Sequence, residues 1–157
     1  MYTKVLYPTD FSDCAARALS AIVKLKEAGA QEVIILHVVD VHRCETALIG
    51  TSWVKAPPAQ YLETLKQELT AIATDESEEV KQKIELAGMR AMIRIITGIP
   101  FREILKTADE EHVDLIVMGS HGKSNIREML LGSVSEKVIR KARQHVLAIK
   151  RDNGEKG

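Results

Sequence analysis

The stretch that decides the fold is Leu115-Ile116-Val117-Met118-Gly119-Ser120-His121-Gly122, in which an apolar run leads directly into a turn that contains two glycines. The apolar part has the length and composition of a strand that is buried on both faces. We expect the glycines where this strand ends, because glycine tolerates a positive φ and lets a ligand approach the main chain closely. The stretch therefore predicts a buried strand whose end exposes backbone amides.

A third glycine follows Gly122 after nine intervening residues, in Gly132-Ser133-Val134-Ser135-Glu136, where a helical pattern begins. Free N–H groups and the positive end of the helix dipole favour anions at such a position. Ser133 and Glu136 also have the spacing of a capping box, so the Ser133 hydroxyl is expected both to cap the helix and to bind a phosphate. The two elements together predict a phosphate-binding site.

Neither of the two commonest nucleotide motifs is present in the sequence. Gly122-Lys123-Ser124 looks like the end of a P-loop signature, but that signature requires a glycine at position 117, which is Val117. No G-x-G-x-x-G fingerprint follows a predicted strand. The remaining pattern is Gly-x2-Gly-x9-Gly-Ser, over residues 119–133.

Short apolar runs rich in β-branched residues recur along the chain and predict further strands. Besides the run at 115–118, they lie at residues 5–7, 33–36, 92–96 and 146–149. Longer stretches of helical period separate these runs, which predicts βαβ units and a mostly parallel sheet with helices on both faces.

Helices are expected between these strands. The first begins at Ser12 or Asp13, ends at Gly29 and has an inward face of Ala15, Leu19, Ile22 and Val23. The second covers residues 59–87, stops at Gly88 and has an inward face of Leu62, Leu65, Leu69, Ile72, Val80 and Ile84. The third runs from Pro100 to about Glu111, through Ile104, Leu105 and Ala108, and the last follows Ser133.

The segment between residues 41 and 58 has no clear period, and either a functional lid or a flexible loop is consistent with it. No internal repeat or low-complexity linker divides the chain of 157 residues. We therefore predict one domain over residues 1–151 and a flexible polar tail over residues 152–157.

Charge and cysteine content indicate which binding partners and which cellular compartment to expect. Lysine plus arginine and aspartate plus glutamate both number 22, so the formal net charge is zero and nucleic acid is not an expected partner. Cys14 and Cys44 have no metal-binding or redox spacing, and the first residues lack a signal-peptide core. No apolar run approaches the roughly 20 residues that span a bilayer. We expect a cytoplasmic protein that does not enter a membrane.

Three blocks of the sequence resemble the universal stress protein family. The pattern Gly-x2-Gly-x9-Gly-Ser resembles its ATP-binding signature, and the other two blocks are Lys4-Val5-Leu6-Tyr7-Pro8-Thr9-Asp10-Phe11-Ser12 and Leu36-His37-Val38-Val39-Asp40. The blocks occur in the family's order over nearly the whole chain. The resemblance implies a doubly wound, five-stranded parallel α/β sheet of order 3-2-1-4-5, like that of the adenine nucleotide alpha hydrolases. It also implies a homodimer, for which the apolar last strand at 146–149 is the expected edge.

The resemblance implies that ATP binds between the first and fourth strands. Asp10 would accept hydrogen bonds from ribose hydroxyls or the adenine amine, although a turn aspartate is an equal alternative from the sequence. The Val38 main chain would contact adenine, although a valine at this position is by default part of the core. The residues expected at the ligand are Pro8, Thr9, Asp10, Val38, Met118, Gly119, Ser120, His121, Gly122, Lys123, Ser124, Asn125, Gly132, Ser133, Val134 and Ser135.

Metal and covalent chemistry have little support in the sequence. The five histidines lack zinc-site spacing, so no metal held by the protein is predicted, and Mg²⁺ or Mn²⁺ would be held through the ATP phosphates. No G-x-S-x-G elbow is present, and Cys14 fits a small core thiol. No catalytic residue is predicted.

The leading functional hypothesis is a nucleotide-dependent regulatory switch in the stress response that acts on an unknown signalling partner. The alternative is a slow ATP hydrolase or a nucleotidyl-transferring enzyme that uses Asp10, His121 or Asp40 as acid, base or metal ligand.

Overall fold

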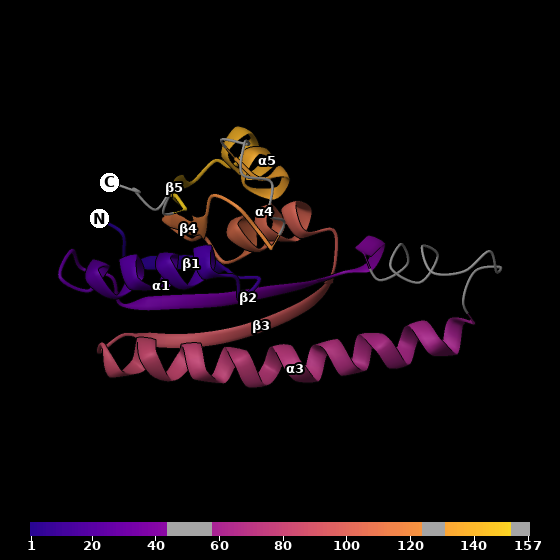
Figure 1. Ribbon diagram of the computed structural model, residues 1–157. Coiled ribbons are helices and arrows are strands. Elements are labelled where there is room, and N and C mark those ends of the chain that lie inside the picture. The colour runs from indigo at the N-terminus through magenta and orange to yellow at the C-terminus, as the bar shows by residue number, and fades with distance from the viewer. Residues whose placement is uncertain (44–57, 124–130, 152–157) are drawn as a thin grey trace, which may run out of the picture.

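Five parallel strands form one sheet in the order β3-β2-β1-β4-β5, which confirms the predicted order 3-2-1-4-5. This topology is that of the computed structural model, which describes residues 1–43, 58–123 and 131–151 (Figure 1). The strands are β1 (Lys4–Pro8), β2 (Glu32–Asp40), β3 (Arg90–Gly98), β4 (Leu115–Gly119) and β5 (His145–Ile149). The helices are α1 (Asp13–Leu25), α3 (Ala59–Leu86), α4 (Pro100–Glu110) and α5 (Ser133–Lys141). The predicted tail and most of the segment at 41–58 lie outside the described residues.

Each face of the sheet is covered by a pair of helices. On one face α1 and α3 pack against the sheet, through a cluster that includes Val5, Tyr7, Val33, Ile35, Ile22 and Ile84. On the other face α4 and α5 do so, through Leu6, Ile34, Leu36, Ile116, Ile104 and Val138. Consecutive residues of β1 therefore contribute to different clusters, as expected for a strand whose side chains alternate between two covered faces.

β1 is short, and its last residue explains why it ends where it does. The Thr9 N–H donates to the Leu36 carbonyl of β2 at 2.9 Å, so the backbone groups of Thr9 face β2. Because successive residues of a strand direct their backbone groups to opposite sides, those of Pro8 face β4. Proline has no N–H to continue that ladder. The pairing of β1 with β4 accordingly stops at Leu6 and Ile116, and the two strands separate beyond it.

β2 continues well past the end of β1. The pairing of β1 with β2 ends at Pro8 and Leu36, whereas β2 stays paired with β3 as far as Asp40 and Gly98. Residues 38–40 thus belong to the strand, which continues beyond the apolar run at 33–36 from which it was predicted. The last four residues of β2 have no strand beside them on the β1 side within the described ranges.

The helix boundaries follow their local signals closely. Ser12 is the N-cap of α1, with its hydroxyl accepting from the Ala15 N–H, and Gly29 and Gly88 have positive φ after α1 and α3. Two predicted core positions are wrong, because Val23 is 36% exposed and Ile72 is 57% exposed. Each lies one residue away from the buried stripe of its helix, and one residue is about 100° of helix rotation.

Tyr7 connects the central strand to the first helix. Its hydroxyl donates to the Ala15 carbonyl at 2.6 Å in the buried interface between β1 and α1. Burial raises the pKa of Tyr7 to about 12, so the phenol remains a neutral donor at physiological pH.

A network of ion pairs joins β1, β2 and β3 to Glu111, the C-cap residue of α4. Lys4 of β1 lies 2.9 Å from Glu111 and 3.5 Å from Glu32, and Arg94 of β3 lies 2.9 Å from Glu111. The hydrogen bond with Lys4 lowers the pKa of Glu111, and the same bond raises the pKa of Lys4. The Glu111 carboxylate therefore forms ion pairs with basic side chains of two strands.

The substitution Glu111→Gln should reduce stability at neutral pH by about 1 kcal/mol or less, since the pair is near the surface. Because the folded-state pKa of Glu111 is lowered, its contribution is fully present above the unfolded value and disappears as the pH falls through the folded value. Urea unfolding at pH 7 and pH 3 should show a difference between the two proteins at pH 7 that closes at pH 3.

The matched control is Glu110→Gln, since Glu110 is 53% exposed and lies 3.9 Å from Lys106 in a single pair within α4. It should change the free energy of unfolding less than Glu111→Gln does. An effect of Glu111→Gln that is independent of pH would show that the ion pairs do not contribute in this way.

Candidate nucleotide-binding site

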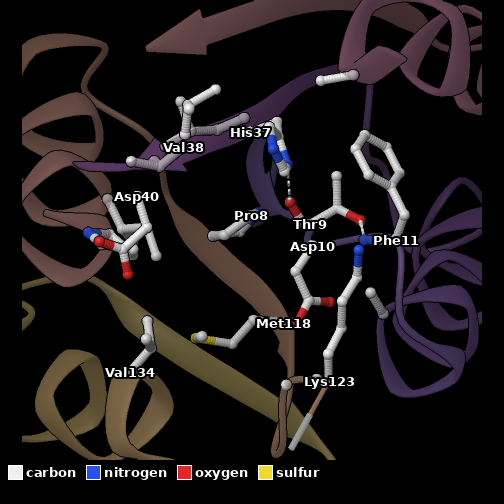
Figure 2. Close-up of a pocket in the computed structure, with 18 of the residues that line it drawn as sticks. Pro8, Thr9, Asp10, Phe11, His37, Val38, Asp40, Met118, Lys123 and Val134 are labelled. Carbon is white, nitrogen blue, oxygen red and sulfur yellow. Dashed lines mark hydrogen bonds between the residues drawn. The ribbon is translucent and has the colours of Figure 1, made fainter. Parts of the chain in front are cut away.

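A cavity of about 690 Å³ lies at the carboxyl ends of β1, β2 and β4 (Figure 2). This is the position at which doubly wound sheets bind ligands, and the volume is in the range of small-molecule sites. Of the residues predicted at the ligand, those that line the cavity are Pro8, Thr9, Asp10, Val38, Met118, Gly119, His121, Gly122, Lys123, Gly132, Ser133, Val134 and Ser135. Ser120 does not line it, and Ser124 and Asn125 lie outside the described residues.

The turn after β1 is held by three successive side chains. Thr9 Oγ1 accepts from the Phe11 N–H at 3.0 Å, Asp10 Oδ1 accepts from the Ser12 N–H at 3.0 Å, and Ser12 Oγ accepts from the Ala15 N–H. These are the local hydrogen bonds by which Thr, Asp and Ser favour turns and helix starts. Asp10 therefore has the turn role considered from the sequence, while its second oxygen, Oδ2, lies beside Gly122 on the cavity wall.

The edge of β2 that β1 leaves uncovered forms another wall. The Leu36 carbonyl points toward β1, so Val38, two residues further, directs its N–H and C=O to the same side. No described backbone group bonds to Val38 across this edge, because the Thr9 carbonyl lies 2.9 Å from Nδ1 of His37 instead. Figure 2 shows Val38 and His37 on this strand, beside Pro8 and Thr9.

The three motif glycines permit close approach between segments. A Cβ at Gly122 would lie 2.9 Å from Asp10 Oδ2, and one at Gly119 would lie 3.0 Å from Cys14 at the start of α1. A Cβ at Gly132 would lie 3.3 Å from the His121 Cα. None of the three has a positive φ, so tolerance of a positive φ, one of the two reasons given for Gly119 and Gly122, does not apply, and crowding is the reason for glycine.

Ser120 links four elements from a buried position. Its N–H donates to the Ile149 carbonyl of β5 at 2.8 Å, and its carbonyl accepts from the Gly132 N–H at 2.7 Å and from Ser135 Oγ at 2.6 Å. Its side chain is fully buried, 2.8 Å from His121 Nδ1 and 3.9 Å from Cys14 Sγ. Ser120 thus positions His121 and the start of α5, both of which line the cavity.

The predicted capping box at the start of α5 is wrong. Gly132 is the N-cap, Ser133 is the first helical residue, and no side chain caps this end. Ser135 bonds to the Ser120 carbonyl and so draws the helix start against β4, while the Glu136 carboxylate pairs with Arg140 at 3.3 Å. Within the part of the chain that the structure describes, the first amides of α5 are consequently left without a side-chain acceptor where Ser133, Val134 and Ser135 line the cavity.

The cavity has further lining residues that were not predicted at the ligand: Phe11, Ala15, Leu36, His37, Val39, Asp40, Arg43, Leu69, Ile72, Ala73, Glu76, Pro100 and Ile104. His37 and Asp40 belong to the block at 36–40, and the sequence named Asp40 only as a possible acid, base or metal ligand of the alternative enzyme. Phe11 stacks on His37 with ring centroids 4.9 Å apart and has a positive φ of 59°. The residues of α3 in this list could not be predicted from the sequence, because they reach the cavity only through the way in which α3 packs at the ends of the strands.

The charges around the cavity are mixed. Asp10, Asp40 and Glu76 are acidic, whereas Arg43 and Lys123 are basic. Asp40 Oδ1 already accepts from the N–H groups of His42 and Arg43, at 3.1 and 3.4 Å. Within the described ranges, no group of three or more His, Cys, Asp or Glu side chains could hold a metal ion.

Comparisons with known proteins agree with this architecture. The model of the universal stress protein family matches residues 1–150. Universal stress protein MJ0577 of Methanocaldococcus jannaschii is 42% identical over 158 residues, which cover 98% of each chain. Universal stress protein YxiE of Bacillus subtilis is 35% identical over 151 residues, which cover 96% of this chain and 100% of YxiE.

Solved structures give the same result. The structure of MJ0577 superposes with a TM-score of 0.85 and covers 98% of this chain and 99% of its own. A universal stress protein in complex with cAMP is 26% identical, has a TM-score of 0.61, and covers 95% of this chain and 97% of its own. The described helices include none with the length and hydrophobicity needed to cross a bilayer. The chain belongs to the universal stress protein family.

Proposed function

We propose that the chain binds ATP in this cavity and acts as a nucleotide-dependent regulatory switch in the stress response. The observation that carries the proposal is that two backbone elements without a partner among the described residues, the edge of β2 at Val38 and the start of α5, line the same cavity. One suits the hydrogen-bonding edge of a base, and the other suits a phosphate. A cytoplasmic setting fits the free thiol of Cys14.

Adenine would lie against β2 in this proposal. Its amine and ring nitrogens would pair with the Val38 C=O and N–H, as a further strand would. The apolar side chains of Leu36, Met118, Val134 and Ile104 would enclose the ring. Asp10 would accept from ribose hydroxyls through Oδ2, because Oδ1 is engaged by the turn.

The phosphates would extend from the ribose toward Gly122 and the start of α5. Backbone amides of Ser133, Val134 and Ser135 would donate to them, and the Ser133 hydroxyl would be available because it makes no cap hydrogen bond. Lys123 would add charge at the rim. Mg²⁺ or Mn²⁺ would be held mainly by the phosphates, since such ions keep several waters and need few protein ligands.

The relative that was solved in complex with cAMP supports an adenine nucleotide as the ligand class. The number of phosphates on the ligand of this chain has to be measured. Calorimetry on protein stripped of nucleotide should therefore compare ATP, AMP and cAMP. The proposal requires ATP to bind near its cellular concentration, and the absence of such binding would rule it out.

The substitution Gly122→Val should lower ATP affinity by at least tenfold, about 1.4 kcal/mol. The added side chain would collide with the Asp10 carboxylate and project into the space proposed for the phosphates. Calorimetric titration measures the affinity, and circular dichroism confirms that the variant is folded. The control is Ala28→Val, at an exposed position after α1, which should bind ATP normally. Unchanged affinity in folded Gly122→Val would refute this placement of the phosphates.

A slow ATP hydrolase or nucleotidyl transferase is the second candidate, because Asp10 and His121 both line the cavity. The switch requires no turnover, so we expect no phosphate or AMP release above that of a protein-free sample over several hours. Release that depends on the protein and is lost in Asp10→Ala and His121→Ala would favour the enzyme instead.

We further propose that the switch is a homodimer formed through β5. This strand pairs only with β4 in the described part of the sheet, and Leu147 on it is 38% exposed. An apolar edge strand is stabilised when a second copy covers it. Leu147→Lys should therefore shift sedimentation toward the monomer. Leu86→Lys, at an 88% exposed position on α3, should leave the assembly unchanged, and equal behaviour of the two variants would contradict this interface.

A further inference from the structure

Three cationic side chains surround one aromatic ring on the outer layer of helices. Phe101 of α4 has Lys137 Nζ 4.9 Å, Lys141 Nζ 5.4 Å and Arg102 Cζ 5.8 Å from its ring centroid. Lys137 and Lys141 lie one turn apart on α5, so both reach the ring from the neighbouring helix. We call these four residues the Phe101 cluster.

None of the three cations has an acidic partner in the described part of the chain. The carboxylates of α4 and α5 are engaged elsewhere. Glu110 pairs with Lys106, Glu136 with Arg140, and Asp109 accepts from Gln144. Glu103 is directed away, against Gly98. Among residues 1–43, 58–123 and 131–151, the ring is the only partner found for three charges that repel one another.

The Phe101 cluster is accessible and separate from the nucleotide cavity. Arg102, Lys137 and Lys141 are exposed, and none of the four residues lines the cavity. Phe101 itself packs on the apolar cluster beneath α4 and α5, which holds the ring in place. The cations therefore converge on a fixed aromatic surface.

Unpaired cations on a fixed surface are suited to an anionic partner. Three separate cationic side chains lie over the Phe101 ring, so a partner that carries several negative charges can pair with each of them. Carboxylates two residues apart in an extended peptide are about 6.6 Å apart. The zero net charge of the chain provides no general field that would draw nucleic acid to it.

We propose that the Phe101 cluster is a docking surface for an acidic peptide segment of a partner protein. Arg102, Lys137 and Lys141 bind its carboxylates, and the Phe101 ring keeps the three cations gathered before the partner arrives. The inference goes beyond the proposed nucleotide switch, because it holds whether or not the cavity binds ATP. It assigns a place and a chemistry to a protein partner.

The test uses the full chain and a fluorescein-labelled 12-residue peptide of alternating Glu and Ala. A peptide of alternating Gln and Ala is the uncharged comparison. Fluorescence anisotropy should show binding of the acidic peptide that weakens from 50 to 150 mM salt, since exposed charges are screened. The double substitution Lys137→Gln/Lys141→Gln should weaken binding about tenfold, as expected for the loss of two ion contacts.

The matched control is Lys24→Gln/Lys83→Gln, which removes two exposed lysines from α1 and α3 on the opposite face. It should bind the acidic peptide as the unaltered chain does. Equal loss in both double variants, equal binding of the Gln–Ala peptide, or no binding at millimolar protein would each overturn the proposal. The Lys137→Gln/Lys141→Gln variant should bind ATP with the same affinity as the unaltered chain. The ATP titration therefore tests the nucleotide proposal independently of the peptide experiment.

Two other occupants are distinguished in the same experiment. A single-stranded RNA 12-mer that binds more tightly than the acidic peptide would assign the cluster to nucleic acid and overturn the proposal. Self-association that disappears in Lys137→Gln/Lys141→Gln would assign it to a second copy of the chain, whose α3 carries the acidic run Asp75-Glu76-Ser77-Glu78-Glu79.

Discussion

The structure of the candidate site depends on one constraint, which is that β1 ends early. On one side of it β2 continues further, and on the other side β4 diverges from it. Pro8 cannot donate to β4, so β1 and β4 separate beyond Leu6 and Ile116. On the other side β2 remains paired with β3 as far as Asp40 and leaves its inner edge uncovered. A backbone edge without a partner is costly when buried, and a ligand that supplies hydrogen bonds is one way to satisfy it.

The elements around this opening are held by hydrogen bonds between main-chain groups and small polar side chains. Thr9, Asp10 and Ser12 carry the chain from β1 into α1. Ser120 and Ser135 hold the end of β4 against β5 and α5. These side chains are used for structure, whereas the backbone edge of β2 and the first amides of α5 line the cavity together with charged side chains. In the proposed function the backbone groups would bind and orient the nucleotide.

The residues of the glycine motif therefore have two kinds of role, because some let chain segments pack closely and others face the cavity. Gly119 and Gly132 are small because helix and strand backbones meet there, whereas Gly122 faces the Asp10 carboxylate on the cavity wall. Ser133 was expected to divide its hydroxyl between a cap and a ligand, and the actual cap position belongs to Gly132. Outside the cavity, the Phe101 cluster has a different character, because its charges are on side chains and are exposed.

The sequence by itself determined where most strands and helices lie, because apolar runs, Pro100, Gly29 and Gly88 are local signals, whereas the order of the sheet was implied by the resemblance to the universal stress protein family. Together with that resemblance it identified half of the residues on the cavity wall, since the carboxyl ends of parallel strands meet at one edge. Only the tertiary structure decided that β2 outlasts β1, that Ser120 is buried away from the cavity, and that α3 contributes Ile72 and Glu76 to it. It also brought Phe101 beneath lysines from another helix. These features depend on contacts between residues far apart in the chain, and no local pattern encodes such contacts.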